Sequence, residues 1–144
     1  MEGAAANTPA GRLRRDLALR LVFLKLHEAS RETATRSDGS RLAAALVAVR
    51  ENPGADWTVP ELAKRAGLSV AHAARRIRAL TGLSPRAFVI RARIERARRL
   101  LEESSLSLEQ VASSLGYTDV YFFHRQFKAV AGVTPGRWRR ERVG

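Results

Sequence analysis

The chain is short and strongly basic. It has 144 residues, and its 45% hydrophobic content is typical of a folded globular protein rather than a disordered tail. Its 26 lysine and arginine residues outnumber 14 aspartate and glutamate residues, so the formal net charge of +12 favours a polyanionic partner, nucleic acid before an anionic membrane surface. Cysteine is absent, which excludes disulfides, thiolate catalysis and cysteine-ligated zinc and favours a cytoplasmic location.

The first 40 residues fall into three parts. Residues 1–11 contain glycine and proline without periodicity and are predicted to be disordered. Leucines then recur at spacings of four and three, at Leu13, Leu17, Leu21 and Leu24. This pattern predicts one amphipathic helix over residues 12–29, whose apolar face would pack on the rest of the chain, pair with a second copy or lie on a membrane. Residues 30–40 are polar and are predicted to form a linker or a loop between helices.

From Arg41 onward the sequence is helical in character and lacks the alternation of a strand, which predicts an all-α fold. This part also contains an internal repeat. Residues of the first copy recur 49 positions later, and after one inserted residue in the turn near Asp119 they recur 50 positions later. The matched pairs are Thr58 and Ser107, Leu62 and Val111, Ala63 and Ala112, Ala66 and Leu115, Gly67 and Gly116, then Arg75 and Arg125, Ile77 and Phe127, Gly82 and Gly132, Ser84 and Thr134, Pro85 and Pro135, Phe88 and Trp138.

Each copy has the start and stop signals of a helix, a tight turn and a second helix. Two capping boxes are predicted to begin the first helices, Thr58 with Glu61 and Ser107 with Gln110. The glycines and hydroxyl or carboxylate side chains that follow predict where those helices end and the next begin, at Gly67, Gly116, Ser69, Asp119, Ser84 and Thr134. Apolar residues on the inner faces predict two cores, made of Leu62, Leu68, Ile77, Leu80, Val111, Tyr117, Phe123, Phe127 and Val130. Three further aromatics are interpreted as core residues, namely Trp57, Phe88 and Trp138.

The chain resembles the DNA-binding domain of the AraC/XylS family of bacterial transcription regulators, most closely in the second copy. The resemblance rests on four stretches: Gly116 to Asp119, Phe123 to Lys128, Gly132 to Pro135, and Trp138 with Arg139. It extends over residues 41–140. It implies two homeodomain-like helix-turn-helix subdomains, at about 58–82 and 107–132, joined by a long helix at about 85–103. Domain boundaries follow at 1–40 for the N-terminal tail, helix and linker and at 41–144 for the DNA-binding domain.

The joining helix has a length suited to two DNA-reading units. From Pro85 to Glu102 it would span roughly 27 Å, which is comparable to the roughly 34 Å between successive major-groove faces on one side of B-DNA. One chain would then contact two adjacent major-groove segments. Because the two copies differ in sequence, we expect an asymmetric target unless the protein dimerises.

The residues predicted to meet DNA are those on the outer faces of the two second helices. On the first they are Ala71, His72, Arg75, Arg76 and Arg78, and on the second Val120, Tyr121, His124, Arg125 and Lys128. Tyr121, His124 and Arg125 match positions that the family uses for reading bases, and Arg75 would bind a guanine. The first helix departs from the family at Ala71, Ala73 and Ala74, which suggests an anchoring role. In the alternative interpretation, Arg75 and Arg125 pair with carboxylates such as Glu95 or Asp119, and Tyr121 and His124 are solvated.

The sequence therefore predicts a DNA-binding transcription regulator, an activator by family precedent, with double-stranded DNA and RNA polymerase as partners. A homodimer through residues 12–29 would resemble other members of the family. Arg93 is placed to dock between the subdomains, and neither a cofactor, a metal site, a catalytic motif nor a membrane span is predicted. The rival functions are a non-specific nucleic-acid-binding protein and a protein-interaction module on the same scaffold.

Overall fold

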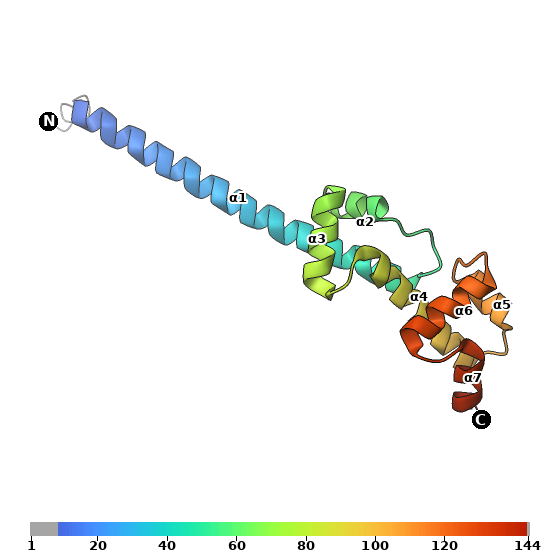
Figure 1. Cartoon of the computed structure of the whole chain (residues 1–144). Helices are drawn as coiled ribbons and strands as arrows, with labels where there is room; N and C mark the ends of the chain where they lie inside the picture. Colours follow the sequence, from blue (N-terminus) through green and yellow to red (C-terminus); the bar gives the residue numbers. More distant parts are fainter. Residues whose placement is uncertain (1–8, 144) are drawn as a thin grey trace. The chain divides into compact units, whose positions relative to one another are not determined.

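The computed structural model of the protein describes residues 9–143, and every regular element in that range is a helix (Figure 1). The helices are α1 (Pro9–Glu51), α2 (Val59–Ala66), α3 (Val70–Thr81), α4 (Pro85–Glu103), α5 (Leu108–Ser114), α6 (Val120–Ala131) and α7 (Pro135–Val143). The predicted all-α class is confirmed. None of the described helices has both the length and the apolar character needed to cross a bilayer.

The chain divides by its internal contacts into two units, Met1–Gly39 and Ser40–Gly144, with α1 contributing to both. The prediction of a linker or loop over residues 30–40 is wrong, because α1 continues through it. Its polar side chains suit a helix in water, and the hydroxyls of Thr33 and Thr35 donate to carbonyls one turn earlier, at 2.9 and 2.8 Å. Of the tail predicted to be disordered, residues 1–8 lie outside the described residues, whereas α1 already begins at Pro9.

Side-chain caps begin the helices of the second unit largely as predicted. Ser69, Ser84 and Asp119 accept hydrogen bonds from backbone N–H groups in the first turns of α3, α4 and α6. The Ser107 and Gln110 capping box is complete. The other predicted capping box is half-formed, because Thr58 accepts from the N–H of Glu61 at 3.2 Å while the Glu61 carboxylate accepts from Arg65 Nε at 3.0 Å.

Two hydrophobic cores organise the second unit, and α4 contributes to both. The first core joins the end of α1 to α2, α3 and the start of α4, through Leu42, Ala45, Leu46, Val49, Leu62, Ala66, Ile77, Val89 and Ala92. The second joins the rest of α4 to α5 and α6, through Ile94, Ala97, Leu101, Val111, Ala112, Leu115, Tyr117, Phe123 and Phe127, and Trp138 of α7 packs against it. Figure 1 shows α5, α6 and α7 gathered around the second half of α4. We call the elements around these cores the first and second subdomains.

All but one of the predicted core residues are buried or half-buried. The predicted core aromatics Trp57, Phe88 and Trp138 pack against the two cores. Leu80 was expected inside, but its side chain is 57% exposed. The inner face of α3 repeats every four residues after Ala73 and Ile77, so the next inner position is Thr81, whose hydroxyl donates to the Ile77 carbonyl at 2.7 Å.

Candidate nucleic-acid interface

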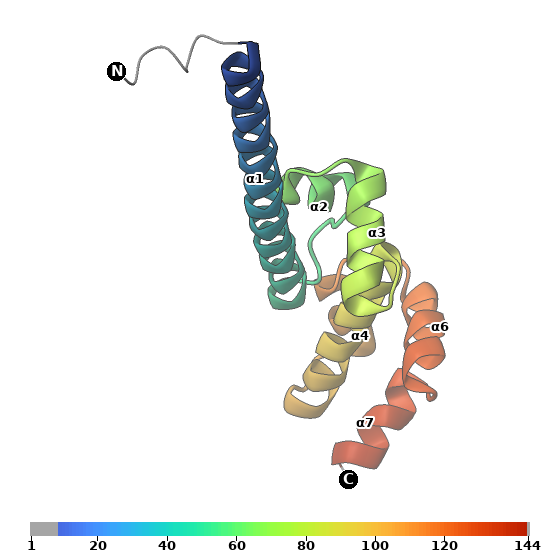
Figure 2. The same cartoon turned by 90° about the vertical axis from the view of Figure 1, so that its left-hand side faces the viewer.

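The second helix of each helix-turn-helix is α3 in the first subdomain and α6 in the second. Each is fixed by two fully buried residues four apart, Ala73 with Ile77 and Phe123 with Phe127, so the opposite faces are turned to solvent. Figure 2 shows α3 and α6 on the same side of α4. The helices α3 and α6 therefore lie on one side of α4, and each has a face exposed to solvent.

The outer face of α3 is small and basic. Four of its five predicted DNA-contacting residues are exposed and Arg76 is half-buried; the exposed ones are Ala71, His72, Arg75 and Arg78. Glu95, the suggested structural partner of Arg75, instead forms a long ion pair with Arg50, with a nitrogen–oxygen distance of 3.9 Å. The short alanine side chains leave the arginines as the groups that extend furthest from this face.

The outer face of α6 is larger and more varied. Tyr121 is 73% exposed. Arg125 and Lys128 are also exposed, whereas Val120 and His124 are half-buried. The Asp119 carboxylate, the suggested partner of Arg125, accepts from the Tyr121 N–H at 2.9 Å and so caps the helix.

Phe122 is a residue of this surface that sequence reasoning missed. Its ring is 38% exposed, and the Arg125 guanidinium carbon lies 5.7 Å from the ring centroid, within the range of a cation–π contact. The contact places the Arg125 guanidinium beside the Phe122 ring. The sequence did contain a signal for Phe122: it is an aromatic residue that falls outside the four-residue spacing of the core residues Phe123 and Phe127.

The charge of the two helices favours an anionic partner. Neither α3 nor α6 contains an aspartate or glutamate, while α3 contains three arginines and α6 contains Arg125 and Lys128. No local carboxylate within these helices offsets their positive potential. The arrangement suits phosphate binding together with hydrogen bonding to base edges.

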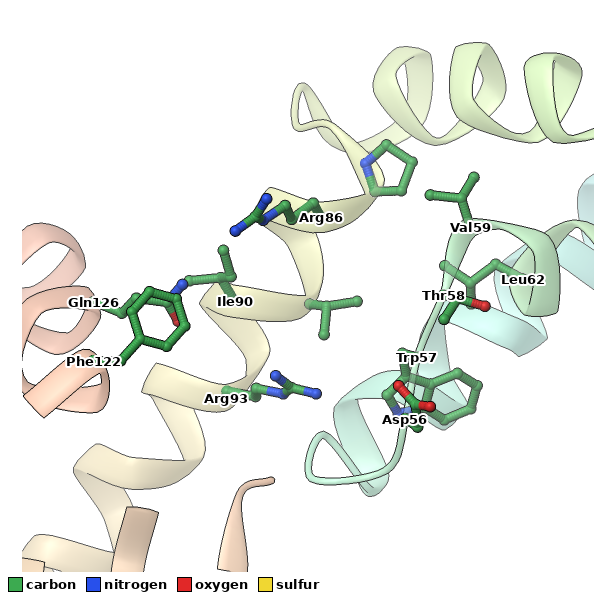
Figure 3. Close-up of a pocket in the computed structure, with 12 residues that line it drawn as sticks. Asp56, Trp57, Thr58, Val59, Leu62, Arg86, Ile90, Arg93, Phe122 and Gln126 are labelled. Atoms are coloured by element: carbon green, nitrogen blue, oxygen red, sulfur yellow. The ribbon is translucent and has the colours of Figure 1, made fainter. Parts of the chain in front are cut away.

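An open pocket of about 330 Å³ lies between α2, α4 and α6 (Figure 3). Phe122 and Gln126 line it from α6, and Arg86 and Ile90 line it from α4. Gln126 is held in place by the Tyr117 hydroxyl, which donates to Gln126 Oε1 at 2.6 Å. Burial raises the pKa of that hydroxyl, against the opposing effect of Arg93, so Tyr117 remains a neutral donor at physiological pH.

Comparisons with known proteins match the second unit. A family model described as a helix-turn-helix domain matches residues 62–141. An AraC-like transcription regulator of Streptomyces lividans is 36% identical over 99 residues, covering 69% of this chain and 33% of its own length. The transcriptional activator RclR of Escherichia coli is 36% identical over 103 residues, covering 72% of this chain and 36% of its own.

A solved structure links the same fold to DNA. The DNA-binding domain of AdpA, crystallised in complex with a target DNA, superposes with a TM-score of 0.67 at 32% identity, over 70% of this chain and 91% of that one. The chain spans about a third of the length of the curated relatives that it matches. The similarity therefore covers only part of those relatives.

Proposed function

Because this chain belongs to the AraC family, whose members are DNA-binding transcription regulators rather than enzymes, we propose that it binds specific DNA sequences and regulates transcription. The observation that carries the proposal is the presence of two basic, acid-free second helices on one side of α4. Residues 41–144 act as the DNA-binding domain. In it, α3 and α6 enter adjacent segments of the major groove.

The two helices contribute unequally. On α6, Tyr121, His124 and Arg125 read base edges, with Arg125 suited to bidentate binding of guanine. On α3, Arg75 contacts a base while Arg76 and Arg78 bind phosphates, which adds affinity without sequence information. The remaining contacts come from the flanks of the same faces, at Ala71, His72, Val120 and Lys128.

Selection of binding sites from random DNA duplexes with the purified chain tests this function. We expect an enriched site with two unequal halves, centred about one helical turn apart. Near-equal affinity for all sequences, with steep salt dependence, would instead identify a non-specific nucleic-acid-binding protein. Absence of DNA binding would identify a protein-interaction module.

We also propose that the N-terminal unit forms a homodimer through residues 12–29. In the part of this segment whose side chains are described, Leu21 and Leu24 are 58% and 59% exposed, and Val22 and Leu26 are exposed beside them. Apolar side chains gathered on one short stretch of helix commonly mark an association surface. A second copy would cover them and place two DNA-binding domains on one operator.

Sedimentation of the whole chain at increasing concentration tests the dimer. The wild type should shift from monomer to dimer mass, and the double substitution Leu21→Glu and Leu24→Glu should remove the shift. Leu80→Glu is the matched control, because Leu80 is 57% exposed but lies outside the segment. A wild type that stays monomeric at all concentrations would contradict the proposal.

The regulatory setting is proposed from the relatives. RclR is named a transcriptional activator, so we propose activation through contact with RNA polymerase, at the nucleoid in the cytoplasm. A reporter placed downstream of the selected site, assayed by in vitro transcription with RNA polymerase, distinguishes activation from repression.

A further inference from the structure

The two subdomains touch through backbone where the loop between α1 and α2 meets the turn between α5 and α6. A Cβ atom added to Gly54 would lie 2.5 Å from the Ser114 carbonyl oxygen and 3.2 Å from Leu115 Cα. A Cβ atom added to Gly116 would lie 2.7 Å from the Gly54 carbonyl oxygen. Neither neighbour is a movable side chain, so only glycine fits at both positions while this contact is kept.

The requirement at Gly54 comes from the contact alone. Gly116 has a φ of +83°, so its turn would favour glycine in any surroundings. Gly54 has no positive φ, and its backbone conformation is open to other residues. Its lack of a side chain therefore reflects the approach of the second subdomain.

Arg93 of α4 also holds this loop. Its Nε donates to the Pro53 carbonyl at 2.9 Å and its Nη2 donates to the Ala55 carbonyl at 3.2 Å. Its guanidinium carbon lies 5.6 Å from the centroid of the Tyr117 ring, in the second subdomain. Figure 3 shows Arg93 extending from α4 toward the segment that contains Asp56 and Trp57.

One end of this contact is tied to the first core, and the other is tied to α6, which with α3 forms the pair that we call the recognition helices. The loop is tied to the first core by Trp57, whose Nε1 donates to the Asn52 carbonyl at 2.7 Å. On the other side, Tyr117 packs on Phe123 of α6, with 5.2 Å between ring centroids. Because the loop and Tyr117 are each fixed within their own subdomain, movement of one subdomain against the other would break the contacts that Gly54, Arg93 and Gly116 make between them.

We propose that Gly54, Arg93 and Gly116, here called the bridging contact, fix the distance and rotation between α3 and α6 and thereby set the spacing of half-sites that the protein accepts. These are positioning residues, since none of them is expected to touch a base. The inference rests on the proposed function, because spacing has meaning only if both helices read one DNA site. If only the joining helix α4 connected the two subdomains, they could still bend and twist relative to one another. The bridging contact prevents these movements.

The test measures binding to three duplexes derived from the selected site. One has the native spacing, one has a base pair inserted between the half-sites, and one keeps only the half read by α6. The wild type should bind the inserted duplex about tenfold less tightly than the native one, a cost similar to that of a mismatched base pair. Gly54→Ala and Arg93→Gln should bring that ratio to within about twofold, while binding to the half-site duplex stays at the wild-type value.

Matched controls separate spacing from folding and charge. Gly136→Ala adds a Cβ whose nearest neighbour, Arg140 Nη1, is 3.7 Å away, and Arg99→Gln removes one exposed charge from α4. Both should keep the wild-type ratio. If Gly54→Ala does not fold, as judged by circular dichroism, Arg93→Gln decides the outcome.

Two results overturn the inference while leaving the proposed function intact. In one, the wild type binds its site specifically but tolerates the inserted base pair. In the other, the folded variants keep the wild-type ratio or lose affinity equally for all three duplexes. A failure of the proposed function gives a third result: the wild type would not prefer the selected site over unrelated DNA.

Discussion

Arg125 and Arg76 lie on different recognition helices and are predicted to play different parts. Arg125→Ala should reduce affinity for the selected site by about 1–3 kcal/mol and relax the base preference in one half, because a bidentate contact is lost. Arg76→Ala should weaken binding to all duplexes about equally, because a phosphate contact has no sequence preference. Titration against the selected site and its single-base variants measures both. If neither substitution changes DNA binding, the assignment of these helices to the groove is wrong.

Two neighbouring aromatics of α6 separate stability from recognition. Phe123 is fully buried, so Phe123→Ala should lower the free energy of unfolding by about 3–5 kcal/mol. Tyr121 is 73% exposed, so Tyr121→Ala should leave the unfolding free energy nearly unchanged and reduce DNA affinity. Denaturant unfolding and DNA titration of both variants check the pair. A large stability loss in Tyr121→Ala would contradict its role on the surface.

At the level of single residues, the sequence predicts burial where a regular spacing continues through a helix. Phe123 and Phe127 lie four apart in the middle of α6, and both are fully buried. Leu80 lies at the end of α3, where a three-residue step from Ile77 leaves the inner face, and composition alone gives no sign of this. Nothing in the sequence marks Gly54 as a contact residue, because its role depends on a backbone segment that is distant along the chain.

The start of α6 depends on the Asp119 cap. Its carboxylate accepts from the Tyr121 N–H at 2.9 Å, so Asp119→Ala should lower the free energy of unfolding by about 1 kcal/mol. Asp119→Ser should recover most of the loss, because a serine hydroxyl can accept the same bond. Thermal unfolding of the three proteins measures the effect. Equal losses for alanine and serine would show that the cap is not the source of the stability.

Helix starts are predictable from sequence when the capping side chains have no competing partner. Gln110 completes its capping box with Ser107, whereas Glu61 pairs with Arg65 one turn further along α2. Sequence is also ambiguous at residues 30–40, because their polar composition fits a loop and an exposed helix equally well. This region contains no proline to break a helix, and α1 continues through it.

For the whole molecule, the second unit, which we propose to bind DNA, extends into α1. Four buried residues of the first core lie on α1 before its end at Glu51: Leu42, Ala45, Leu46 and Val49. The repeat begins only at Thr58, so the repeated sequence alone underestimates the folded unit. The family resemblance, which starts near residue 41, includes this segment.

Two truncations of the chain therefore differ in outcome. A chain that begins at Ser40 keeps all four buried side chains of α1, and we expect cooperative unfolding and binding to the half-site duplex. A chain that begins at Asn52 loses them, and burial of each large apolar side chain contributes roughly 1.5–3 kcal/mol. The combined loss is comparable to the roughly 5–15 kcal/mol stability of a whole domain. Thermal unfolding by circular dichroism should show a cooperative transition only for the longer chain, and equal transitions would mean that the first core is stable without α1.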